Sequence, residues 1–238
     1  MELFSMEGLH FLLRYAHFLA GIVWIGVLYY FNFIQTPFFG TELGGGAKSA
    51  ITRGLVPNAL WWFRWGAMFT FISGVLILML KLHEGVPLGS GYMTRILTGG
   101  LLGTLMWANV WFVIWPAQQT VIANANNVAG GGEADPAAAA AGGRAGMASR
   151  TNTLFSIPML FFMAAATHFP SLTSDLNTGG GSLGVYWLVA FVLILANEAN
   201  GLIGPGASTQ KVLTTVSGTI HTGLGLTLLL FLAQSFLL

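Results

Sequence analysis

The sequence predicts an all-α fold, a polytopic membrane helix bundle with about six transmembrane helices. Hydrophobic residues make up 55% of its 238 residues and charged residues only 7%, whereas an ordinary soluble domain carries about 25% charged residues. Several apolar runs are long enough to cross a bilayer, because about 20 apolar residues span its roughly 30 Å hydrocarbon core. We therefore expect residues 1–238 to form a single domain embedded in a lipid bilayer.

Apolar runs and their flanking residues define the predicted helices. The helices lie at about residues 9–34, 59–81, 95–115, 153–169, 183–203 and 212–236. No basic region precedes the first run and no small-residue cleavage site follows it, so we expect it to stay in the mature protein. Prolines near the helix ends are Pro37, Pro57, Pro116 and Pro205, positions where a missing N–H costs little. The fourth helix is the shortest, and Pro158 falls in its first turns.

The stretch at about 120–148 is the longest non-apolar segment of the chain. Its Gly, Ala and Asn bias, NANNVAGGGEADPAAAAAGGRAGM, leaves few side chains that could pack. We predict a flexible loop that opens as an extension of the third helix.

Charge and cysteine content exclude several kinds of site. The formal net charge is +1 and no basic patch is present, so the sequence gives no indication of nucleic-acid binding. The chain has no cysteine, which excludes disulfides, thiolate metal sites and a CxxCH attachment site for c-type haem.

The basic residues in the loops and near the helix ends predict the orientation. The loops after the first, third and fifth helices carry most of them: Lys48, Arg53, Arg144, Arg150 and Lys211, with Arg64 close by. The opposite side has Arg14, Lys81 and Arg95. The positive-inside rule then places both termini outside the cytoplasm.

Two histidines lie deep in predicted helices. By helical rise, His17 lies about 12 Å below the outer surface and His221 about 15 Å from the opposite surface. An ionisable side chain at such depth is costly unless it ligates, pairs or relays something. Two imidazoles at similar depth on different helices are what a bis-histidine haem b requires, so we predict these two as ligands of the haem iron. The alternative is that each only hydrogen-bonds across a helix interface.

Other polar residues could extend this site. His10, Arg14 and His17 share one face of the first helix. Arg14 could hold a haem propionate or extend to the lipid headgroups. His168, about 6 Å below the surface, could ligate a second haem with His10 or line an entrance.

A structural ion pair is predicted at the other end. Arg64 and Glu198 fall at similar depths, about 8 Å into the second and fifth helices. Pairing would remove the penalty of burying either charge. The alternative is a proton or substrate contact.

Four stretches resemble one known family. They are RYAHFLAGIVWIGVLYYF, WWFRWGAMFTFISGVLIL, NVWFVIWPAQQ and RTNTLFSIPMLFFMAAATHFP, in this order along the first 170 residues. They resemble the membrane domain of bacterial membrane-bound urate hydroxylases, the urate oxidase N-terminal domain. The first stretch is also similar to copper-resistance membrane proteins and haem-binding membrane protoporphyrinogen oxidases. In both comparisons the residue that carries over is His17.

The chain departs from this family at several positions. The urate enzymes end in a c-type cytochrome domain, whereas this chain has no cysteine. Histidines of the family's second helix and a following glutamate are replaced here by Ala59, Trp61 and Gly66, and a histidine-rich lead into helix four is reduced to 150–152. These changes remove polar groups that could handle a purine.

The resemblance implies a multi-pass protein of the bacterial inner membrane with periplasmic termini. We expect a redox protein that binds haem b and passes electrons to a periplasmic partner such as a c-type cytochrome. Whether it is itself an oxidoreductase is left open. The alternatives are a non-catalytic subunit of a larger membrane complex, and urate-type oxidation with a separate cytochrome c.

Overall fold

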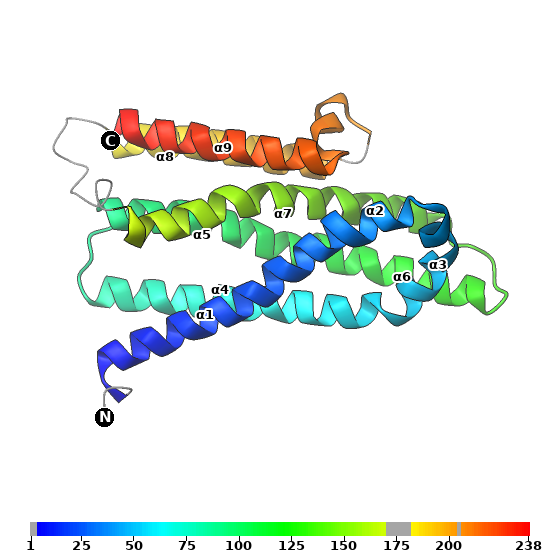
Figure 1. Cartoon of the computed structure of the whole chain (residues 1–238). Helices are drawn as coiled ribbons and strands as arrows, with labels where there is room; N and C mark the ends of the chain where they lie inside the picture. The colour runs from blue at the N-terminus through cyan, green and yellow to red at the C-terminus, as the bar shows by residue number, and fades with distance from the viewer. Residues whose placement is uncertain (1–3, 170–181, 204–205) are drawn as a thin grey trace.

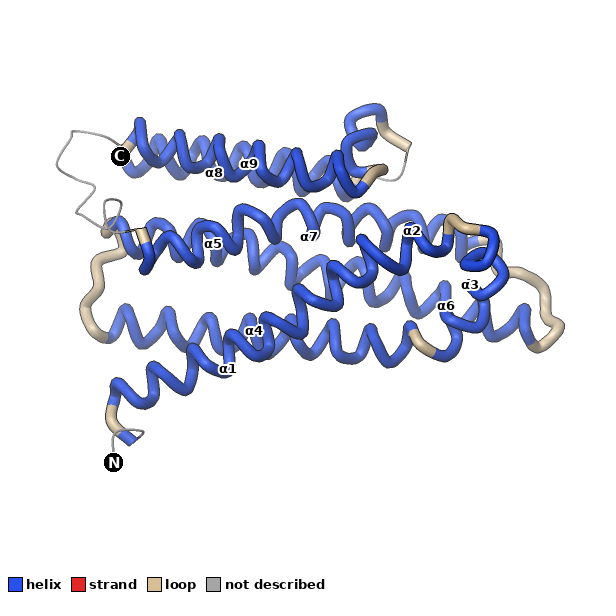
Figure 2. Tube along the Cα trace, in the orientation of Figure 1, coloured by secondary structure: helices blue, strands red, loops and turns tan. Residues whose placement is uncertain are grey.

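The computed structural model describes residues 4–169, 182–203 and 206–238, which are almost entirely helical (Figures 1 and 2). The first elements are α1 (Met6–Tyr29), the π-helical segment η2 (Tyr30–Gln35), α2 (Thr36–Phe39), α3 (Glu42–Gly54) and α4 (Val56–His83). Next come α5 (Gly91–Ala108), the π-helical segment η3 (Asn109–Ile114), α6 (Trp115–Ala129) and α7 (Ala137–His168). The last are α8 (Leu183–Leu202), the 3₁₀ helix η6 (Ser208–Leu213) and α9 (Val216–Leu237).

Among the described residues, five helical segments are long and apolar enough to cross a membrane. They are Met6–Phe39, Val56–His83, Gly91–Ala129, Leu183–Leu202 and Val216–Leu237. A sixth long helix, α7, lies in the middle of the bundle (Figure 1). Half of its 32 residues are buried, and a helix surrounded by protein needs less apolar surface than one that faces lipid. The predicted all-α membrane bundle is therefore confirmed.

The predicted flexible loop at 120–148 is wrong for most of its length. α6 continues to Ala129 and α7 begins at Ala137, so only a short connection separates them. Four alanines at 138, 141, 145 and 148 are buried along one face of α7. Alanine has the highest helix propensity, and small side chains let neighbouring helices approach closely. Pro158 consequently lies inside α7 and not in its first turns.

Each π-helical segment comes just before a proline. Pro37 follows η2 and Pro116 follows η3, and both prolines stand at the start of the next α-helix. Proline removes one helical hydrogen bond and clashes with the carbonyl four residues earlier. A π-helical segment lets the chain continue through this defect as one rod. The third predicted span, expected to end at 115, therefore runs on to Ala129.

The helices form three groups side by side. α1 packs along α4, α5 packs along α7, and α8 pairs with α9. The α8–α9 pair rests on α7, and α1 and α4 lie on the other side of the α5–α7 layer (Figure 1). Both termini lie at one end of the bundle, and α2 and α3 lie at the opposite end, which we call the α3 end (Figure 1).

Glycine allows α9 to approach α7 closely. A Cβ added at Gly223 would lie 2.6 Å from the Ile157 Cδ1 atom and 2.8 Å from the Leu154 carbonyl oxygen. Leu154 is the residue four positions before Pro158, so no proline N–H binds its carbonyl. We predict that Gly223→Ala destabilises the bundle by about 1–3 kcal/mol, the usual cost of overpacking.

The control is Gly225→Ala on the same helix, because nothing lies within 4 Å of a Cβ there. Thermal unfolding of both variants in detergent is the measurement. Equal melting temperatures for the two variants would contradict the close α7–α9 approach.

Candidate functional site

A large pocket opens at the α3 end of the bundle. Its volume is about 1100 Å³. Its walls come from η2, α2, α3, α4, η3, α6, α7 and η6. Small residues line the α7 wall, including Ala138, Gly142, Ala145 and Gly146. The alanines and glycines of the segment that was predicted as a loop thus belong to a helix, and their small side chains leave space for the pocket along one side.

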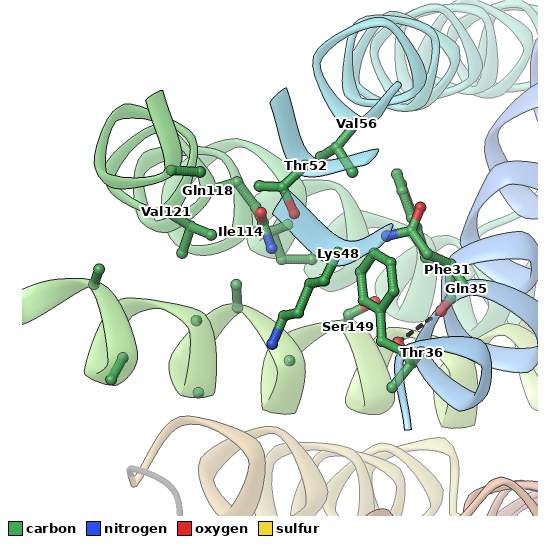
Figure 3. Close-up of a pocket in the computed structure, with 18 of the residues that line it drawn as sticks. Phe31, Gln35, Thr36, Lys48, Thr52, Val56, Ile114, Gln118, Val121 and Ser149 are labelled. Atoms are coloured by element: carbon green, nitrogen blue, oxygen red, sulfur yellow. Dashed lines mark hydrogen bonds between the residues drawn. The ribbon is translucent and has the colours of Figure 1, made fainter. Parts of the chain in front are cut away.

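Polar side chains from four elements line the pocket. Figure 3 shows Gln35, Lys48, Thr52 and Gln118 among the labelled lining residues. Asn32, Asn124 and Ser149 are further neutral polar residues of the lining, while Phe31, Phe39 and Phe63 supply aromatic walls. The charged lining residues among the described ones are Lys48, Asp135 and Arg150.

Two of these polar groups lack partners within the described chain. The Arg150 Nη1 and the Gln35 Oε1 atoms are buried, and neither makes a hydrogen bond there. Arg150 as a whole is 9% exposed. Leaving a buried polar group unsatisfied costs about 1–3 kcal/mol, and more for a charged one. A donor that carries a positive charge and a neutral acceptor are therefore both available to a ligand.

The exposed cation at the pocket is Lys48 of α3. Its side chain reaches across the pocket towards α7 (Figure 3). Its Nζ atom also lies 6.0 Å from the centre of the Phe39 ring. Lys48 and Arg150 together give the pocket a net positive charge despite Asp135.

The π-helical segments position part of the pocket wall. η2 contributes Phe31, Asn32 and Gln35, and η3 contributes Ile114. The Asn32 Nδ2 atom donates to the Leu28 carbonyl at 2.9 Å and to the Ser149 Oγ atom at 2.8 Å, which fixes η2 against α7. Such π-helical insertions are frequent at functional sites.

A buried polar network holds η3, α7 and α8 together. The Asn109 Nδ2 atom donates to Asn152 Oδ1 at 2.9 Å and to Glu198 Oε2 at 3.1 Å. The Asn152 Nδ2 atom in turn donates to the Met106 carbonyl at 2.9 Å. Asn152 lies two residues after Arg150, so this network fixes the part of α7 that carries the pocket arginine.

The structure does not bring His17 and His221 together. The His17 Nδ1 atom lies 3.1 Å from the Ser73 Oγ atom on α4. His221 is exposed, and its Nδ1 atom hydrogen-bonds the Ser217 carbonyl of its own helix at 2.7 Å. The α5–α7 layer lies between α1 and α9 (Figure 1), and α7 side chains fill the space at Gly223. The pair therefore does not fit a bis-histidine haem site.

The other predicted haem residues lie apart as well. His10 is buried and pairs through Nε2 with the Glu84 carboxylate, which follows α4. Arg14 is exposed on α1, and His168 is exposed as the last residue of α7. None of the hydrogen bonds or ion pairs of the described residues joins His10 to His168.

The predicted ion pair of Arg64 and Glu198 is not formed. The Arg64 guanidinium stacks on the Trp115 ring, with 3.5 Å from Cζ to the ring centre, and Trp111 lies next to it. Glu198 instead accepts from Asn109. Helix α4 packs on α1, whereas α8 packs on α9 and α7, so the two side chains face different neighbours.

A family model for the urate oxidase N-terminal domain matches residues 87–198. Residues 87–198 are therefore similar to the urate oxidase N-terminal family. The resemblance expected from the sequence is thus confirmed, and two of its four motifs fall inside the match. Searches of curated proteins and of solved structures found no significant match.

The segment that matches the family model contributes part of the candidate site. It covers α5, η3, α6, α7 and most of α8, and therefore Arg150, Gln118, Asn124 and the Asn109 network. Lys48 and Gln35 lie before it, as does His17, and His221 lies after it. Sequence reasoning missed Gln35 and Asn32 as site residues. Their signal was an amide within an otherwise apolar helix.

A charged cluster at the termini end gives a test of pH dependence. The Glu84 carboxylate accepts from Lys81 Nζ at 2.6 Å and pairs with His10. The hydrogen bond from Lys81 and then that from His10 hold the pKa of Glu84 below its usual 4.5. A lowered pKa in the folded state contributes stability above the unfolded pKa, and this stability is lost as the pH falls through the folded pKa.

We therefore predict that Glu84→Gln lowers the melting temperature near neutral pH and that the difference disappears as the pH falls through the lowered pKa of this carboxylate. Melting curves between pH 3 and pH 8 are the measurement. A constant difference across the whole series would show that the ion pairs contribute nothing.

Proposed function

We propose that this chain is a membrane-embedded binding module of urate oxidase N-terminal type that takes a small planar organic anion in the pocket at the α3 end. The observation that carries the proposal is the pair of unpartnered buried atoms, Arg150 Nη1 and Gln35 Oε1, on the wall of one pocket. A ligand with an anionic oxygen and an N–H group would satisfy both. Urate has both groups.

The rest of the pocket suits such a ligand. Arginine forms strong, charge-assisted hydrogen bonds to planar anions, and Lys48 adds a second positive charge near the opening. Phe31, Phe39 and Phe63 provide apolar faces for a flat ring. Small-molecule sites typically combine mostly apolar walls with a few convergent polar groups. The chain lacks the histidines of the family's second helix. In this proposal, amide side chains and the two cations Lys48 and Arg150 supply polar groups to the ligand instead.

The test is equilibrium dialysis of urate against the protein in detergent or nanodiscs. We expect saturable binding of urate, which is an anion at neutral pH, and much weaker binding of hypoxanthine, a neutral purine. Lys48→Met should weaken urate binding, because it removes a cation from the pocket. Arg53→Gln is the matched control, since Arg53 is exposed on the same helix and does not line the pocket. Equal binding of both purines would contradict the proposal.

Haem binding and electron transfer remain a second proposal, in which one histidine of the chain, His17, ligates the haem iron. The Ser73 hydroxyl engages the Nδ1 atom of His17, which makes Nε2 the ring nitrogen that could coordinate iron. The purified protein would then show a Soret absorption band that His17→Ala removes and His221→Ala leaves unchanged. A colourless preparation reconstituted with haem to no effect would contradict it.

We also propose that the α3 end faces the cytoplasm of a bacterial inner membrane, with both termini in the periplasm. The basic residues Lys48, Arg53, Arg144 and Lys211 support this orientation by the positive-inside rule. Because the chain has no cysteine, single cysteines can report it. Glu133→Cys should be protected from an impermeant thiol reagent in intact cells, and Leu88→Cys should be labelled. The opposite pattern would reverse the orientation.

Partner proteins are part of the proposal as well. A periplasmic c-type cytochrome, or the other subunits of a larger membrane complex, would be recovered when the protein is purified in mild detergent. Urate-dependent reduction of added cytochrome c would favour the cytochrome. Urate binding without reduction, together with stable co-purifying subunits, would favour a non-catalytic subunit.

A further inference from the structure

A second cationic group is buried at the end of the bundle that carries the termini. Arg95 lies in the first turns of α5 and is fully buried. Its Nε atom donates to Gln234 Oε1 of α9 at 3.3 Å. Tyr186 of α8, also fully buried, lies within electrostatic reach of the guanidinium. Three helices therefore enclose this arginine.

The free groups around Arg95 are all hydrogen-bond donors. Its Nη1 and Nη2 atoms are buried without a partner in the described structure, and so is the Nε2 atom of Gln234. Gln234 is 1% exposed. The Tyr186 hydroxyl is already engaged with Thr98 Oγ1 at 2.6 Å. Only an acceptor can satisfy such a set of donors.

Charge makes the need for an acceptor stronger. Arginine stays protonated in proteins, and an uncompensated buried charge costs several kcal/mol. Among the described residues, the ion pairs are those of Glu84 with His10 and with Lys81. Glu198 is engaged with Asn109, and Glu133 and Asp135 lie at the connection between α6 and α7. No described carboxylate therefore neutralises Arg95.

We propose that Arg95 and Gln234 form an internal binding site for a small inorganic anion such as chloride, between α5, α8 and α9. One monovalent ion would neutralise the guanidinium and accept from the free donors of both side chains. The enclosure of Arg95, Gln234 and Tyr186 favours a compact ion over an organic one. The bound ion would hold the start of α5 against the end of α9, at the opposite end from the pocket.

Thermal unfolding in a series of sodium salts at constant ionic strength tests this site. A ligand that binds only the folded state stabilises it in a saturable manner. We expect chloride and bromide to raise the melting temperature by about 2–8 °C over gluconate, the scale of one to two kcal/mol in a chain of this size. The absence of any difference between the salts would overturn the proposal.

Variants locate the effect. Gln234→Glu places a carboxylate beside the Arg95 Nε atom, so it should fill the site from within and remove the dependence on halide. Arg95→Met should remove it too. Lys48→Met, at the other end of the bundle, should keep it, which separates this site from the proposed pocket. A halide effect that survives in Gln234→Glu, or that is lost in Lys48→Met, would contradict the assignment.

A last variant distinguishes a bound inorganic ion from a carboxylate of the chain itself as the partner of Arg95. Asp175 lies outside the described residues. If the wild-type protein shows no halide effect and Asp175→Asn gains one, the chain supplies its own anion and the proposal is wrong. A bromide anomalous peak beside the Arg95 guanidinium in crystals of the whole protein would confirm the ion directly.

Discussion

Replacing Arg150 with methionine is expected to weaken urate binding by at least about tenfold, because a hydrogen bond to a charged group contributes about 1.5–3 kcal/mol. Methionine keeps much of the length of the arginine stem while it removes the charge. The Nη1 atom of Arg150 is unpartnered in the described structure, so the change breaks no protein hydrogen bond of that atom. Folding should be affected far less than binding.

Isothermal titration with urate and a melting curve on the same sample separate the two effects. Arg150→Lys is the second variant, since lysine keeps the charge and loses the planar geometry. We expect intermediate affinity for it. Wild-type affinity in Arg150→Met with an unchanged melting temperature would remove this residue from the site.

Replacing Asn109 with leucine is expected to cost the bundle about 2–5 kcal/mol, the range for breaking a buried network that includes a charged group. The change removes the donor to both Asn152 and Glu198 and leaves a carboxyl group without a partner in an apolar bundle. Because Asn152 lies two residues after Arg150 on α7, urate binding should weaken along with stability.

Glu198→Gln is the conservative comparison, because its amide oxygen can still accept from Asn109. Asn126→Leu is the control for the substitution itself, as Asn126 is exposed on α6. Unfolding in detergent should rank the variants with Asn109→Leu far below the other two. Similar melting temperatures for all three would show that the network has little effect on stability.

The sequence was sufficient to predict the helices that face lipid, because a membrane span is recognised by its length and its apolar composition. It was insufficient for α7. This helix is surrounded by protein, so alanines at 138, 141, 145 and 148 replace the large apolar residues by which a span is recognised. Their spacing along one face was present in the sequence and would have predicted the helix.

The structure does not bring the predicted haem ligands together, and the reason is geometric. Helical rise gives the depth of a residue such as His17 or His221, but neither the side of the helix that it faces nor the neighbour of that helix. Arg64 and Glu198 were expected at similar depths, but their helices, α4 and α8, do not pack together. The pocket was missed because its walls come from segments far apart in the chain, and π-helical segments place Gln35 and Asn32 on it.

A structure of the protein with bound urate would show whether the pocket at the α3 end is the binding site. We expect density for a flat ligand there, with an oxygen within hydrogen-bond distance of Arg150 Nη1 and an N–H facing Gln35 Oε1. Saturating urate that leaves this pocket without ligand density, or that binds only in the apolar groove formed by Trp61, Trp62 and Trp65 with α1, would contradict it.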